Sequence, residues 1–112
     1  MDPRIELALE IMLRGLDEPQ LVNRISARLG LSPSRFEHLF KAATGQTFKA
    51  RLRAARMDKA KELLLDPTQS IKEVAAAVGY KHARNFTRDF AMRHGKPPSQ
   101  HRISSLVAGF AS

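Results

Sequence analysis

The chain has 112 residues, which is enough for one small domain or for two very small subdomains that share a central element. Its 19 lysines and arginines against 11 acidic residues give a net charge of +8, which favours a polyanionic partner such as nucleic acid, an anionic membrane surface or an acidic protein. The absence of cysteine excludes disulfides and thiolate metal sites, including those of zinc-finger DNA readers.

Helical periodicity extends along almost the whole chain, because apolar residues recur every three or four positions and the breaks carry Gly, Pro or capping residues. The first predicted helix begins after Asp2 and Pro3 and ends near Gly15. The later helices are predicted over residues 21–29, 32–45, 48–65, 70–79, 82–94 and, as a short final helix, after 98. Ser70 and Glu73 form a capping box at the start of the fifth helix. The sequence therefore predicts an all-α fold of about seven helices.

An internal repeat divides the chain into similar halves. In order, Ile25, Gly30, Phe36, Phe40 and Gly45 correspond to Val74, Gly79, Phe86, Phe90 and Gly95. Each copy comprises a short helix, a turn with glycine and a second helix, which is the helix-turn-helix pattern. We predict one such subdomain over 1–46, a connecting helix over 47–65, a second subdomain over 66–104 and a tail over 105–112. Residues 103–112 are apolar and small, which is consistent with packing on the last helix, with disorder or with a partner contact, and we favour the first two.

The second helix of each copy carries a polar face opposite its phenylalanines, which we assign to the core. In the first copy, Leu39 and Ala43 are predicted to extend the buried stripe. In the second copy, the outward face combines arginine with asparagine, which suit bidentate contacts to guanine and adenine in the major groove. An ordinary helical hairpin is the alternative, but its solvated face would more often carry Glu and Lys pairs. The predicted base-reading residues are Ser34, Glu37, His38, Lys41, Arg84, Asn85, Arg88 and Asp89.

The connecting helix is basic and of a length that suits DNA. At 1.5 Å per residue it extends about 27 Å, which with the hairpins' own width would set the two readers about 34 Å apart, one turn of the duplex. Basic side chains and helix N-termini can contact phosphates and so fix the register without reading sequence. The predicted phosphate-contacting residues are Ser32, Arg51, Arg53, Ser70, Lys72 and Lys81. Sequence-specific binding of double-stranded DNA is therefore the predicted function.

Other functions find less support in the sequence. The four histidines lack metal-ligand spacing, and no phosphate loop, nucleophile elbow or carboxylate pair is present, so we expect neither an enzyme nor a metal or other cofactor. A non-specific basic module for nucleic-acid binding or protein interaction is the main alternative. Residues 48–65 could also lie on a membrane surface, but their apolar residues are needed to hold the subdomains. No apolar stretch approaches the roughly 18 residues that span a bilayer, so we expect a soluble protein without membrane contact.

A family resemblance emerges from the second repeat. The segments Val74 to Tyr80, Asn85 to Phe90 and Gly95 to Pro98, followed by Arg102, resemble the signature of the DNA-binding domain of the AraC/XylS family of bacterial transcriptional regulators. The likeness covers about residues 21–102. It implies seven helices, binding to DNA as a monomer or as side-by-side copies, transcription activation through RNA polymerase, and a place on the nucleoid in the bacterial cytoplasm. The chain would then be either a complete small regulator or a C-terminal fragment of a longer one.

The chain departs from this family pattern at several positions. Lys81 stands where a small capping residue is common, and Asn85 where an aromatic residue is usual. His94 replaces an apolar residue, His101 a frequent Tyr and Ser26 a common Ala. The resemblance therefore predicts the fold and the class of ligand, and the base preference has to be measured for this chain.

Overall fold

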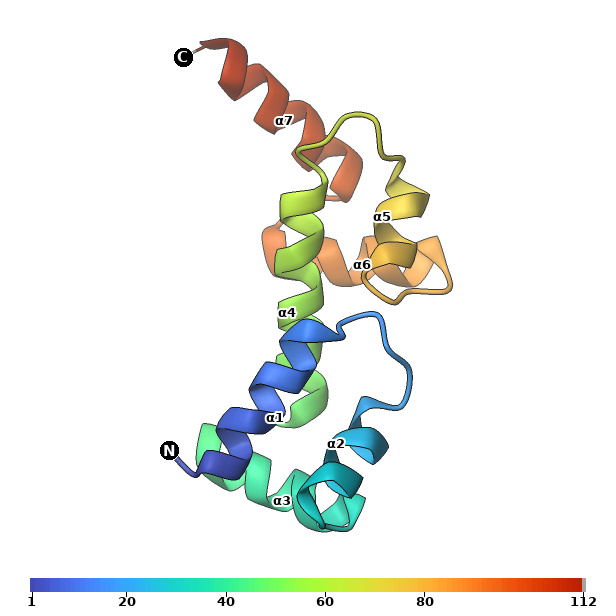
Figure 1. Ribbon diagram of the computed structural model, residues 1–112. Coiled ribbons are helices and arrows are strands. Elements are labelled where there is room, and N and C mark those ends of the chain that lie inside the picture. Colours follow the sequence, from blue (N-terminus) through green and yellow to red (C-terminus); the bar gives the residue numbers. More distant parts are fainter. Residues whose placement is uncertain (112) are drawn as a thin grey trace. The chain divides into compact units, whose positions relative to one another are not determined.

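The computed structural model describes the backbone of residues 1–111 and the side chains of residues 1–108. Over that range the chain forms helices and turns without any β-strand (Figure 1), which confirms the predicted all-α fold. The helices are α1 (Pro3–Arg14), α2 (Leu21–Leu29), α3 (Pro33–Thr44), α4 (Phe48–Leu63), α5 (Ile71–Ala77), α6 (Ala83–His94) and α7 (Pro98–Ala111).

The helices belong to two compact units, which we call unit 1 (Met1–Ala55) and unit 2 (from Arg56 onward). Each unit has its own hydrophobic core. The helix α4 serves both: Phe48 in its first turn is buried in the core of unit 1, while Met57 and Ala60 are buried in the core of unit 2. The division between the units therefore falls inside α4.

The core of unit 1 is built around three aromatic rings. Phe48 lies at 5.4 Å from Phe36 and at 5.3 Å from Phe40, measured between ring centroids, with both pairs in edge-to-face geometry. Ile5 from α1 and Ile25 from α2 are fully buried in the same cluster. The first helix of the chain is thus part of the core that supports α3.

The core of unit 2 repeats this plan with Phe86 and Phe90 of α6, packed with Val74 of α5 and the last turns of α4. Phe86 and Phe90 lie 5.8 Å apart between ring centroids. The assignment of all four repeat phenylalanines to the core is confirmed, since each side chain is fully buried.

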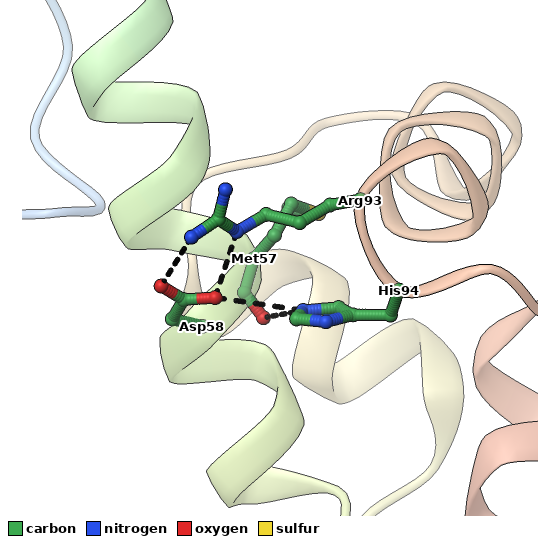
Figure 2. Close-up of polar contacts among 4 residues, drawn as sticks. All are labelled: Met57, Asp58, Arg93 and His94. Carbon is green, nitrogen blue, oxygen red and sulfur yellow. Dashed lines mark hydrogen bonds and ion pairs between the residues drawn. The ribbon is translucent and has the colours of Figure 1, made fainter.

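Polar contacts between α6 and α4 frame this core (Figure 2). Arg93 donates two hydrogen bonds of 2.8 Å to the two carboxylate oxygens of Asp58. Beside them, Nε2 of His94 lies 3.1 Å from the carbonyl oxygen of Met57 and 3.6 Å from Asp58 Oδ1. The Arg93 guanidinium holds the pKa of the Asp58 carboxyl below its ordinary value by donating these hydrogen bonds. Arg93 and His94 thereby fasten α6 to α4.

The final helix is longer than predicted. It was expected to be short and to be followed by a tail from residue 105, but α7 continues to Ala111. Its residues Ile103, Leu106 and Val107 recur at helical spacing and are exposed. Ser112, the last residue of the predicted tail, lies outside the described residues. The spacing of these three apolar residues was the signal for a helix.

Candidate nucleic-acid interface

In unit 1, α3 is the second helix of the helix-turn-helix and presents a polar face. Gly30 ends α2 in the left-handed region at φ 71°, a conformation that glycine adopts without steric cost, and this permits the tight turn. Ser32 then caps α3, accepting a 3.1 Å hydrogen bond from the Arg35 amide. Since Phe36 and Phe40 face the core, the opposite face is solvent-exposed. As predicted, the exposed residues include Ser34, Glu37, His38 and Lys41.

The buried stripe of α3 is shorter than predicted. Leu39 packs against the core of unit 1, but Ala43 is exposed, so its assignment to the stripe is wrong. Ala43 lies in the last turn of α3, where the face that begins at Phe36 extends past the packed part of the unit.

An open groove runs beside α3, within unit 1. It has a volume of about 590 Å³ and lies between the exposed face of α3 and the start of α4. Its lining residues are Glu37, His38, Lys41, Ala42, Thr47, Phe48 and Lys49. Three of the four base-reading residues predicted in this copy therefore converge on one concave surface.

Thr47 and Lys49 were missed as members of this surface. Thr47 Oγ1 accepts a 3.1 Å hydrogen bond from the Ala50 amide, and a Thr just before a helix was the signal for such a cap.

In unit 2, α6 occupies the equivalent place. Ser70 caps α5, with its hydroxyl accepting a 3.0 Å hydrogen bond from the Glu73 amide, which is one of the two hydrogen bonds of the predicted capping box. The N-cap of α6 is His82, whose side chain makes no capping hydrogen bond. Along α6, Arg84 and Arg88 are exposed and Asn85 is half-buried.

The prediction that Asp89 points outward is wrong. The residue is only 8% exposed, and its carboxylate accepts hydrogen bonds on both oxygens. The Tyr80 hydroxyl donates to Oδ2 at 2.6 Å, and Arg88 Nε donates to Oδ1 at 3.2 Å. A carboxylate removed from water requires such partners, so the turn that carries Tyr80 fixes the direction of Asp89. Asp89 therefore lies under the exposed polar face of α6 and not on it.

The predicted phosphate-contacting residues are distributed over both units. Ser32 and Ser70 are exposed at the N-termini of α3 and α5, and Arg53, Lys72 and Lys81 are exposed as well. Arg51 is half-buried, and its Nη1 donates a 3.3 Å hydrogen bond to Gln46 Oε1.

The structure offers little for other chemistry. Among the described residues, no three His, Asp or Glu side chains gather into a group that could hold a metal ion. Within the same part of the chain, no helix is both long and apolar enough to cross a membrane.

The fold and the exposed polar faces of α3 and α6 define a helix-turn-helix protein of the DNA-binding class. In agreement, residues 25–103 match the family model described as a helix-turn-helix domain. The xylose operon regulatory protein of Escherichia coli strain K12 is 28% identical over 101 residues, which cover 90% of this chain and 26% of that protein. The transcriptional regulator Rob of Salmonella typhimurium strain LT2 is 30% identical over 103 residues, which cover 91% of this chain and 36% of that protein.

A solved structure extends the comparison to a complex. The DNA-binding domain of the global transcriptional factor AdpA, determined with a target DNA, superposes with a TM-score of 0.82 at 25% identity and covers 90% of this chain and 91% of that chain. The chain belongs to the AraC/XylS family of helix-turn-helix transcriptional regulators, which confirms the resemblance in the sequence. It spans 26% to 36% of the length of the two curated relatives described above.

Proposed function

We propose that this chain is a DNA-binding regulator of transcription that reads double-stranded DNA by inserting α3 and α6 into successive major grooves. The observation that carries the proposal is the pair of exposed polar faces, one on the second helix of each helix-turn-helix unit. Each face combines donors and acceptors with a rigid phenylalanine core behind it, the arrangement that direct base readout requires. The AdpA domain, similar over nine-tenths of the chain, was solved on its target DNA, which supports the same use of this fold.

The residue assignments follow from exposure. Direct contact with bases is assigned to the exposed or half-buried polar residues of the two reading helices, without Asp89. This set comprises Ser34, Glu37, His38, Lys41, Arg84, Asn85 and Arg88. Contact with phosphates is assigned to Ser32, Arg51, Arg53, Ser70, Lys72 and Lys81, which is favoured by the net charge of +8. Since the two reading sets differ in every residue type, the two halves of the DNA site should differ in sequence.

The wider role is proposed from the family. The chain activates transcription by contact with RNA polymerase, binds as a monomer in solution or as paired copies on DNA, and acts on the nucleoid in the bacterial cytoplasm. It has no enzymatic activity and needs no cofactor.

Selection of bound duplexes from a random library tests the proposal, followed by a salt titration on the selected duplex and on a shuffled duplex of the same composition. A specific regulator should prefer the selected duplex by about 10³-fold or more, and this preference should persist as salt rises. Equal weakening on both duplexes would instead identify a non-specific basic module. Arg84→Ala and Arg88→Ala should each cost about 1–3 kcal/mol on the selected duplex and relax the preference at defined base pairs. A uniform loss on both duplexes would reassign these arginines to phosphates.

A further inference from the structure

The buried contact between Tyr80, Asp89 and Arg88 suggests how unit 2 prepares its reading face. The Arg88 side chain is 63% exposed, whereas that of Asp89 is 9% exposed, although the two residues are neighbours in α6. Adjacent residues on a helix do not normally face each other, yet Arg88 Nε reaches back to Asp89 Oδ1 at 3.2 Å. The carboxylate thus joins an exposed arginine to a tyrosine hydroxyl beneath it.

Tyr80 is itself held firmly. Its amide donates a 2.9 Å hydrogen bond to the carbonyl of Ala75 at the end of α5, and its ring lies edge-on to Phe86 at 5.7 Å between centroids. Its hydroxyl then donates to Asp89 Oδ2 at 2.6 Å. The position of the Asp89 carboxylate is therefore set by the turn of the helix-turn-helix and by the core.

The repeat shows that the fold does not need this polar contact. In unit 1, Leu31 follows the turn glycine as Tyr80 does in unit 2, and Leu39 precedes the second phenylalanine as Asp89 does. Both leucines pack against the core of unit 1. Since buried polar pairs can often be replaced by apolar residues without loss of stability, an ordinary core would suffice at these places in unit 2 as well. The polar pair accompanies Arg88, whose counterpart in unit 1 is His38.

We propose that Asp89, oriented by Tyr80, is a positioning residue that presents Arg88 to a guanine in the major groove. This inference rests on the proposed function. With Nε bound to Asp89, the free donors of Arg88 are those on its terminal Nη atoms, whose fork matches the O6 and N7 acceptors of guanine. Because one end of the guanidinium is already fixed, less side-chain freedom is lost on binding, and the orientation selects guanine over other bases.

The test compares duplexes and variants by equilibrium binding. The probes are the duplex selected by the unchanged chain from a random library and a shuffled duplex of the same composition. Y80L/D89L installs the leucines of unit 1 and is the central variant, with D89N and Y80F as conservative changes. Each is measured with Arg88 present and in the Arg88→Ala background, and each variant's thermal unfolding midpoint is recorded by circular dichroism.

The positioning role predicts a specific pattern. Y80L/D89L should leave the unfolding midpoint unchanged and keep the affinity for the shuffled duplex within about twofold. Its affinity for the selected duplex should fall by about 2- to 10-fold, with relaxed preference at one guanine. In the Arg88→Ala background the same change should cost less than about twofold, because there is no arginine left to orient. Y80F should show a smaller loss in the same direction.

Several outcomes would overturn the inference. Unchanged selectivity in Y80L/D89L, an equal loss on both duplexes, or an equal loss with and without Arg88 would each show that the carboxylate does not act through the arginine. If Y80L/D89L fails to fold, Y80F decides, since its ring still packs on Phe86: reduced selectivity at an unchanged midpoint supports the role, and unchanged selectivity contradicts it. If the unchanged chain selects no sequence at all, the proposed function itself fails. If the unchanged chain selects a sequence and Arg88→Ala keeps the same sequence preference, only the present inference fails.

Discussion

Arg102 fastens α7 to the end of α4 within unit 2, and its removal should destabilise that unit measurably. Its Nε donates a 3.1 Å hydrogen bond to the carbonyl of Leu64, and Nη2 donates a 3.3 Å hydrogen bond to the carbonyl of Asp66. Both carbonyls follow the last turn of α4, where helix carbonyls lack intrahelical partners and a cation is favourable. Arg102→Ala leaves these carbonyls without this charged donor.

The geometry sets the expected magnitude. A hydrogen bond with a charged partner contributes about 1.5–3 kcal/mol. The bond to Leu64 is partly buried and of ordinary length, whereas the bond to Asp66 is exposed and long, so we count only the first in full. The free energy of unfolding of unit 2 should therefore fall by about 1.5–2 kcal/mol. Arg102→Lys keeps the charge but loses the fork, and its loss should be intermediate.

The sequence supplies a convenient probe for this measurement. Tyr80 is the single tyrosine and the chain has no tryptophan, so tyrosine fluorescence during urea denaturation reports on unit 2. Lys96→Ala is the matched control, because it also removes one positive charge and breaks only the exposed 3.0 Å hydrogen bond to Ser104. That control should change stability by less than about 0.5 kcal/mol. If Arg102→Ala and Lys96→Ala shift the transition equally, the carbonyl contacts of Arg102 do not stabilise unit 2.

Three further changes test the local chemistry. Ser70→Ala should cost about 1 kcal/mol in urea denaturation, because the Glu73 amide loses its cap; Ser70→Asn should restore most of this, and an equal loss in both would contradict capping. Burial lowers the pKa of His101 from its ordinary 6.5, so the stabilisation linked to its neutral form is lost as pH falls below about 6.5. His101→Phe should therefore flatten the dependence of the unfolding free energy on pH between about pH 7.5 and 5.5. An unchanged slope of this dependence would refute the reasoning. Hydrogen bonds from Arg93 lower the pKa of Asp58. The ion pair therefore stabilises unit 2 above the ordinary pKa of 3.8, and this stabilisation is lost as pH falls through the folded-state pKa. Asp58→Asn should lower the free energy of unfolding by about 0.5 kcal/mol at neutral pH and by less at high salt, and the absence of a salt effect would count against the pair.

Periodicity and capping predicted most of the fold, because these signals are local. The four repeat phenylalanines lie in the two cores, and Ser32 and Ser70 cap the helices that they were expected to begin. These features depend on residues close in sequence, so a single chain is enough to recognise them.

The predictions were wrong where the burial of a side chain depends on a residue distant in sequence or on how far a neighbouring element extends. Asp89 lies at the edge of the core face of α6, beside Phe86 on the side away from Phe90, and its charge argued for solvent. The hydrogen bond from Tyr80, nine positions earlier, is a tertiary contact that helps to compensate the burial of this carboxylate. Ala43 has the right periodicity for the core face of α3, but periodicity gives a side chain's direction and not the reach of the element that would cover it.

The two units now differ in more than the residues that they expose. In unit 1 the exposed residues Glu37, His38 and Lys41 line an open groove, and leucines that pack against the core stand at the places of Tyr80 and Asp89. In unit 2 a buried carboxylate is connected to an exposed arginine. On the proposed function, the first arrangement would leave flexible side chains to adapt to the bases, whereas the second would fix a donor before DNA arrives. If α3 and α6 read DNA as proposed, the two units recognise it in different ways, and the discrimination between base pairs should be sharper in the half of the site assigned to α6.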